Sequence, residues 1–146
     1  MPAHRTGLQR ASRIALGAML LFTGIGHLTF LRRDFRAQVP DWVPLPVGAT
    51  VVLSGAAEVA IGTSLILVTG PQQAALGQLT AAFFAAVFPG NVSQWLNRRN
   101  AFGLDTDKKR LARLFFQPLL IYWALASTRA RAARGTRPAA RAIRAG

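Results

Sequence analysis

The feature that most constrains this sequence is a long apolar stretch in its middle. Residues 42–97 carry a single charged side chain, Glu58. The dipeptide Gly70-Pro71 divides the stretch into two parts, and each part has the roughly 20 apolar residues that a helix needs to cross the hydrocarbon of a bilayer. The sequence therefore predicts two spans, over 47–69 and 72–96, joined by a tight turn as an antiparallel hairpin.

Two further apolar segments predict one span on each side of this hairpin. The first covers 12–31. The basic residues before it also resemble the start of a secretory signal, but its apolar run is long and no small-x-small cleavage site follows. The last covers 111–128, and its apolar part, 114–128, measures about 22 Å as a helix. We favour a span over an interfacial helix here, because Arg113 and Arg129 at its ends can extend toward the headgroups.

The charged residues lie mostly outside these segments. The chain has 18 Lys and Arg against 5 Asp and Glu, a net charge of +13, yet its mean hydropathy is +0.28. A nucleic-acid-binding domain spreads its basic residues along folded elements, whereas here they flank apolar segments. We therefore expect a lipid bilayer as partner and no specific nucleic acid. The chain has no cysteine, so thiolate metal sites and thiol redox chemistry are excluded, no metal site is expected, and a redox role requires a bound cofactor.

Together these segments predict an all-α protein, a bundle of four transmembrane helices over residues 12–128. A basic arm, 1–11, precedes the bundle, and a flexible Ala/Arg-rich tail, 129–146, follows it. We expect a multi-pass protein of the bacterial cytoplasmic (inner) membrane. Four spans place both termini on one side. Basic residues are equally numerous on the two sides. Those before the first span favour a cytoplasmic N-terminus, and the C-terminus is then cytoplasmic as well.

Each predicted span contains a polar side chain at a similar depth: His27, Glu58, Asn91 and Gln117. Polar groups inside a bilayer face the interior of a bundle, so we expect these four to share one pocket. A buried carboxylate must be protonated or paired, and His27 is the ionisable residue of another span at a compatible depth. The pair suits proton exchange or the holding of a polar ligand group. The alternative is a hydrogen bond that only fixes helix register, and no catalytic residue is assigned.

Proline and glycine residues predict local distortion and close packing. Pro89 and Gly90, beside Asn91, should kink the third span and free backbone acceptors. Such a kink either lines a cavity or merely bends the helix near its end. Gly24 and Gly55 are expected where helices pack closely.

The connection between the first two spans, residues 35–46, contains three prolines and cannot form a regular helix. We expect it to lie in the membrane interface as a short Pro/Trp-rich cap over one end of the bundle. Trp42 in this cap and Arg113 at the start of the fourth span are the side chains expected at the mouth of the pocket.

Five short motifs, in this order along the chain, resemble those of the DoxX-like family of small bacterial four-helix integral membrane proteins. They lie within residues 14–128: GIGHLTF (Gly24–Phe30), VPDWVPLP (Val39–Pro46), SGAAE (Ser54–Glu58), VFPGN (Val87–Asn91) and RLFFQPLLIYWA (Arg113–Ala124). Some members of that family are subunits of thiosulfate:quinone oxidoreductase, and others are linked to membrane responses to oxidative or thiol stress. The resemblance implies a quinone or another lipophilic redox partner in the pocket, with His27 and Glu58 exchanging protons.

Three functions agree with these observations. The first is an accessory of a membrane redox system that binds a small lipophilic or quinone-like ligand in the polar pocket. The alternative is a structural or assembly subunit without a ligand of its own, bound to another membrane protein or to copies of itself. The third is a membrane isomerase using Glu58 and His27, by distant similarity to four-helix isomerases that act on sterol-like substrates. We do not expect a stand-alone enzyme.

Overall fold

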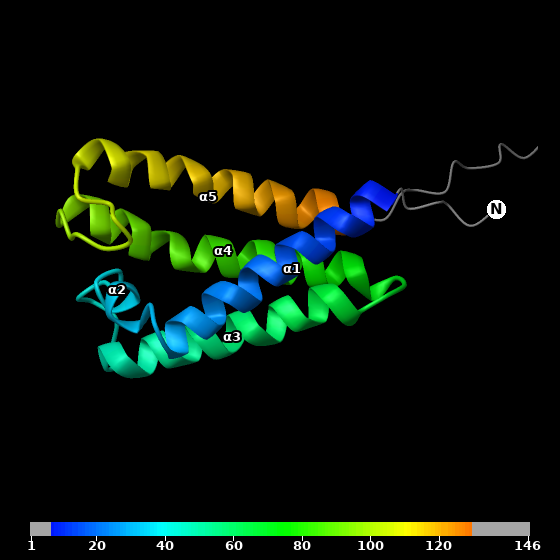
Figure 1. The fold of residues 1–146 in the computed structure, drawn as a ribbon, viewed down its shortest axis with the longest axis horizontal. Helices are drawn as coiled ribbons and strands as arrows, with labels where there is room; N and C mark the ends of the chain where they lie inside the picture. Colours follow the sequence, from blue (N-terminus) through cyan, green and yellow to red (C-terminus); the bar gives the residue numbers. More distant parts are fainter. Residues whose placement is uncertain (1–6, 130–146) are drawn as a thin grey trace, which may run out of the picture.

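The structure, a computed structural model, describes residues 7–129 (Figure 1). Within this range it contains five helices and no strand, which confirms the all-α prediction. The flexibility predicted for the tail concerns residues beyond 129, which fall outside the described residues. The helices are α1 (Gly7–Leu28), α2 (Arg32–Arg36), α3 (Val47–Leu67), α4 (Gln72–Leu96) and α5 (Asp107–Thr128).

The long helices occupy the predicted segments, with some ends shifted. The bounds of α4 are those predicted for the third span. α1 begins before its predicted span. It ends before residue 31, because the chain reverses in a turn in which the Leu31 amide donates to the Gly26 carbonyl at 2.9 Å. α5 begins before position 111, at Asp107. Thr106 Oγ1 caps this start by accepting a hydrogen bond from the Lys109 amide at 3.2 Å. The short helix α2 is absent from the sequence prediction.

α1 and α3 approach each other so closely that only glycine fits between them. A Cβ atom on Gly62 would lie 2.7 Å from the Gly17 carbonyl oxygen, and one on Gly24 would lie 2.9 Å from that of Gly55. The two glycines of each helix are seven residues apart, so the two pairs lie about two helical turns apart along the contact. Small residues allow such approach between helices in membranes. The packing role predicted for Gly24 and Gly55 is therefore confirmed.

α4 and α5 form a second closely packed pair. Gly77 on α4 faces α5, and a Cβ atom at this position would lie 3.0 Å from the Ala124 carbonyl oxygen and close to the Thr128 side chain. The two pairs share one apolar core, to which all four of these helices contribute. Its buried members are Leu16, Leu20, Ile61, Leu65, Ala81, Phe84 and Ala124.

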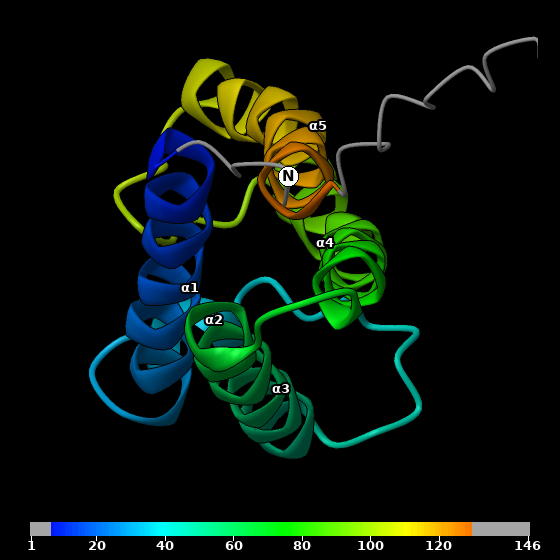
Figure 2. The ribbon, with the colours of Figure 1, turned by 90° about the vertical axis from the view of Figure 1, so that its right-hand side faces the viewer.

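The two described ends of the chain meet at one end of the bundle. Gln9 Nε2 donates to the Arg129 carbonyl at 2.9 Å, and Trp123 Nε1 donates to Ser12 Oγ at 2.8 Å. The turn between α3 and α4 lies at the same end. From this turn α3 and α4 diverge toward the opposite end of the bundle, where the segment with α2 lies (Figure 1, Figure 2).

Three of the described helices, α1, α3 and α4, are long and apolar enough to cross a membrane, which supports embedding in a lipid bilayer. α5 is not among them, and its first turns carry several charges. The apolar part of α5 nevertheless corresponds to the predicted segment 114–128. It exposes large apolar side chains such as Phe115, Phe116, Leu119 and Tyr122.

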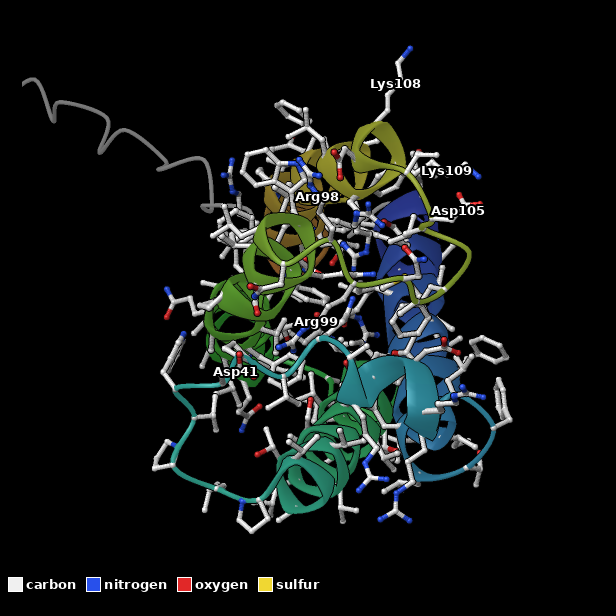
Figure 3. The ribbon with its side chains drawn as sticks, turned by 90° about the vertical axis from the view of Figure 1, so that its left-hand side faces the viewer. Asp41, Arg98, Arg99, Asp105, Lys108 and Lys109 are labelled. Carbon is white, nitrogen blue, oxygen red and sulfur yellow. The ribbon has the colours of Figure 1, made fainter. Side chains whose placement is uncertain are left out.

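The connection between α1 and α3, residues 29–46, is called loop 1 below, and the connection between α4 and α5, residues 97–106, is called loop 3. The guanidinium of Arg99 joins the two loops. Arg99 of loop 3 points to Asp41 of loop 1, with 2.8 Å between Nη2 and Oδ1 (Figure 3). Its Nη1 donates to the Val39 carbonyl at 2.9 Å. Arg99 therefore fixes the Pro-rich part of loop 1 against the end of α4.

Loop 3 is organised around Arg110, whose side chain is buried. Arg110 Nη1 donates to Asn100 Oδ1 at 2.7 Å and to the Leu104 carbonyl at 3.0 Å. On the surface of the same region Lys109 lies beside Asp105 (Figure 3), and its hydrogen bond lowers the pKa of that carboxyl. Exposed pairs of this kind add little stability, so the shape of loop 3 depends mainly on Arg110.

Replacing Gly62 by valine should push α1 away from α3, because the new side chain would collide with the backbone of Gly17. Overpacking of this kind typically costs about 1–3 kcal/mol, so the thermal midpoint of the protein purified in detergent should fall. Gly7→Ala is the matched control, since a Cβ atom at position 7 meets nothing within 4 Å. An unchanged midpoint for Gly62→Val would contradict the close approach of the two backbones.

Candidate functional site

A cavity of about 200 Å³ lies beneath loop 1, where α3 and α4 diverge. α1 contributes His27 to its wall, and α5 contributes Arg113. Loop 1 covers it with residues that include Gln38 and Trp42. The contributions of α3 and α4 are Thr50, Val51, Ser54 and Glu58 from the first, and Ala86, Val87, Pro89, Gly90 and Asn91 from the second. Polar side chains of all four long helices thus line this cavity.

His27 and Glu58 are in direct contact between α1 and α3. Nδ1 of His27 lies 3.1 Å from Oε2 of Glu58, and both side chains are at least nine-tenths buried. Thr23 Oγ1 donates a hydrogen bond to the same oxygen at 2.8 Å. A buried carboxylate is tolerated only with partners of this kind. Both contacts use Oε2, which leaves Oε1 for a ligand in the cavity.

The surroundings of the His27 ring determine where its proton lies. Besides Glu58, Nδ1 has the backbone carbonyl of Thr23 at 2.9 Å. Because a carbonyl oxygen can only accept hydrogen bonds, Nδ1 must carry a hydrogen. The second ring nitrogen, Nε2, is then the atom that can accept a proton from a ligand. A histidine oriented in this way by a carboxylate is suited to general acid and base chemistry.

Phe35 of α2 covers one face of the His27 ring. The two ring centroids are 3.1 Å apart and the rings are nearly parallel. Phe35 in turn contacts Phe102 of loop 3 edge to face, with centroids 4.7 Å apart. The backbone amide of Phe102 donates to Asp34 Oδ1 at 3.3 Å. These contacts connect the histidine to both loops and keep water from one face of the imidazole.

A chain of side-chain amides joins α4, α5 and loop 1. Asn91 Nδ2 donates to Gln117 Oε1 at 3.0 Å, and Gln38 Nε2 donates to Asn91 Oδ1 at 3.1 Å. The same Gln38 nitrogen donates to Gln94 Oε1 at 2.9 Å. Gln117 Nε2 donates to the backbone carbonyl of Phe84. Asn91, Gln94 and Gln117 are almost completely buried, so this chain fixes the α4 and α5 side of the cavity.

Arg113 adds a positive charge to the cavity on the α5 side. Its Nη1 donates to Gln117 Oε1 at 3.3 Å, which ties it to the amide chain. It also interacts electrostatically with Glu58, although no direct ion pair joins the two side chains. The cavity therefore offers a cation and amide groups on the α4 and α5 side, and an imidazole with a carboxylate on the α1 and α3 side.

The proline and glycine of α4 line the cavity, which is one of the two outcomes predicted for this segment. The helix runs through Pro89 from Gln72 to Leu96 as a single element. Gly90 serves to admit the backbone of loop 1, because a Cβ atom there would lie 2.9 Å from the Gln38 carbonyl oxygen. Gly90 therefore positions the cover of the cavity.

The residues selected from the sequence converge at this end of the bundle. Those that line the cavity are His27, Trp42, Glu58, Pro89, Gly90, Asn91 and Arg113, and Gln117 lies behind Asn91. The side chain of Trp42 is exposed, as expected at a mouth. Whether these residues bind a ligand stays a prediction.

Four further residues were not selected from the sequence. Thr23 and Gln94 lie four and three residues from predicted residues on the same helix, a spacing that places side chains on one helical face. Helical spacing could therefore have identified both. Gln38 and Phe35 have no such signal, because their positions depend on the path of loop 1.

The donor set suits an organic molecule better than a metal ion. Across residues 7–129 no three His, Asp or Glu side chains gather closely enough to hold a metal. Amide, guanidinium and imidazole groups instead recognise oxygen atoms of carbonyl or hydroxyl groups.

Residues 16–128 match a protein family described as Domain of unknown function (DUF8561). The chain belongs to this family. The match includes every residue that lines the cavity. No curated protein and no solved structure matches the chain. The function of this DUF8561 member is therefore argued from the geometry of the cavity.

Gln117→Leu should destabilise the bundle, because it leaves the Asn91 amide and Arg113 without their shared acceptor. A buried donor that loses its partner costs about 1–3 kcal/mol, which the thermal midpoint in detergent would report. Gln78→Leu makes the same exchange on an exposed position of α4 and should not lower the midpoint. Equal behaviour of the two variants would show that the amide chain contributes no stability.

Proposed function

We propose that this protein binds the polar ring of a quinone-like lipophilic molecule in the cavity beneath loop 1, as an accessory of a membrane redox system. The observation that carries this proposal is the His27–Glu58 pair, which lines a cavity inside an apolar bundle. Arg113 and Asn91 line the same cavity and can hold a ring oxygen. The resemblance to DoxX-like proteins agrees with the proposal.

The size of the cavity supports a ring as the bound group. Sites for drug-sized ligands usually measure about 300–1,000 Å³, whereas this cavity measures about 200 Å³. A single substituted ring fits that volume, and a long hydrocarbon chain does not.

The pair can take up a proton from a ligand in the cavity. A ring hydroxyl that donates to His27 Nε2 can pass its proton to this nitrogen. The imidazolium then formed is stabilised by Glu58 through the hydrogen on Nδ1. The pair thus changes from a neutral imidazole beside a carboxylate to an imidazolium beside a carboxylate without a change of geometry. The negative charge left on the ring oxygen is removed when the ring gives its electrons to a redox partner.

The electrons of such a reaction must come from another molecule. The chain has no cysteine and its cavity offers proton-exchanging and hydrogen-bonding groups only. Oxidation of a quinol releases electrons as well as protons. We therefore infer a membrane-bound redox partner that exchanges electrons with the ring while this chain binds it and exchanges protons.

In this proposal α5 is the fourth transmembrane helix. The contact between Gln9 and Arg129 places the two described ends of the chain together, as an even number of spans requires. The bundle would lie in the bacterial inner membrane with its termini in the cytoplasm and with loops 1 and 3 on the other side.

A purely structural role is the second candidate. It is favoured by the chain of amides, because Asn91, Gln94 and Gln117 satisfy one another across helices without a ligand. In that case the same residues would fix the bundle for assembly with another membrane protein.

The two candidates differ in the effect of the acid–base pair on bound lipid. The full chain, purified from membranes in mild detergent, should carry a quinone that mass spectrometry of its lipid extract detects. Glu58→Gln and His27→Ala should fold and lose most of this quinone, because each removes the group that holds the ring.

Thr63→Val is the matched control on α3, since the Thr63 hydroxyl is exposed and bonds only to its own helix at the Val59 carbonyl. It should retain the quinone. If Glu58→Gln and His27→Ala retain as much quinone as the control, the ligand is not held by the pair and the proposal is wrong.

The four-span arrangement can be tested by labelling, because the chain is naturally free of cysteine. Single cysteines at Lys108 and Arg129 should react with a membrane-impermeant maleimide from opposite sides of sealed vesicles. A cysteine at Gln72 should share the side of Arg129. Labelling of Lys108→Cys and Arg129→Cys from one side would show that α5 does not cross the membrane.

A further inference from the structure

The gap between α3 and α4 bears on how a ligand reaches the cavity. α1 packs tightly on α3, and α4 packs tightly on α5, in both cases through glycines. No side-chain hydrogen bond in the 7–129 range joins α3 to α4, although the two helices follow each other in the chain. They diverge toward loop 1 (Figure 1, Figure 2). The cavity lies between the diverging parts of the two helices, and residues of both form its wall.

Small side chains line this side. Ser54 of α3 and Ala86 of α4 both border the cavity, and Ala86 is also exposed. A residue that is exposed and also lines the cavity marks the place where the cavity opens outward.

The surface around this opening is apolar. Leu53 of α3 is 59% exposed, and Val47 at the start of the same helix is also exposed. Trp42 of loop 1 borders the cavity and is 72% exposed. Tryptophan prefers the boundary between hydrocarbon and headgroups, so the opening lies just inside that boundary and faces lipid.

We infer that the gap between Ser54 and Ala86 is a lateral opening, through which the hydrocarbon tail of the ligand extends into the bilayer while its ring occupies the cavity. This inference rests on the proposed function and adds the class of ligand, a ring with a hydrocarbon tail of isoprenoid or alkyl type. The cavity of about 200 Å³ accommodates the ring alone, so the tail must leave it. A hydrocarbon tail is more stable in lipid than in water, so the opening toward lipid is its favoured exit.

The test compares two probes on the full chain in lipid nanodiscs: decylubiquinone, and the tail-less dimethoxy-methylbenzoquinone with the same ring. The wild-type protein should bind both, and the decyl compound more tightly. Ala86→Phe should weaken binding of decylubiquinone about tenfold or more, equivalent to about 1.4 kcal/mol or more. Binding of the tail-less ring should fall by a smaller factor, because position 86 borders the cavity at the opening, where the tail leaves it.

Ala85→Phe is the matched control, since Ala85 is an exposed alanine next in the chain that does not line the cavity. It should change neither affinity. Ser54→Leu narrows the same gap from α3 and should reproduce the selective loss, which keeps the test valid if Ala86→Phe fails to fold.

The outcomes separate the opening from the proposed function. If the wild-type protein binds neither probe, both the proposed function and the lateral opening are wrong. The wild-type protein could instead bind both probes while the Ala86 and Ser54 variants keep both affinities, or lose both by the same factor. The lateral opening is then wrong, although the proposed binding of the ring is retained. A wild-type affinity that is the same for both probes would also overturn the opening.

Discussion

Glu58 is a carboxylate inside an apolar bundle, and removing such a group from water without partners would cost several kcal/mol. Two side chains of α1 offset this cost, because Thr23 and His27 both contact Oε2 of Glu58. The contact is short only because the backbones of α1 and α3 almost touch at their glycines. The position of the charge thus depends on the packing of the two helices, and the chemistry proposed for the cavity depends on that charge.

The cavity lies where two differently built halves meet. The α1 and α3 half provides an imidazole and a carboxylate, which can exchange protons. The α4 and α5 half provides Asn91 and Arg113, which hold oxygen atoms but do not exchange protons at ordinary pH. Loop 1 covers both halves and is itself fixed by Arg99. This division of roles gives a bound ring two distinct sides, one for binding and one for proton exchange.

Much of this arrangement could be predicted from the sequence, because the membrane restricts what apolar segments can do. The helix bounds of α4 follow from composition and the Gly70-Pro71 turn, and the meeting of His27 with Glu58 follows from similar depth in neighbouring spans. The roles of Gln38 and Phe35 could not be predicted, since they lie in a loop whose path has no periodicity.

The glycine contact between α1 and α3 has a further consequence for the His27–Glu58 distance. A slip of one helical turn would displace α1 by about 5.4 Å along α3, which is more than the whole 3.1 Å separation between Nδ1 and Oε2. Because glycine meets glycine at two points seven residues apart, any other register would place a side chain against a backbone. The residues with no side chain therefore set the alignment of the two side chains that carry the chemistry.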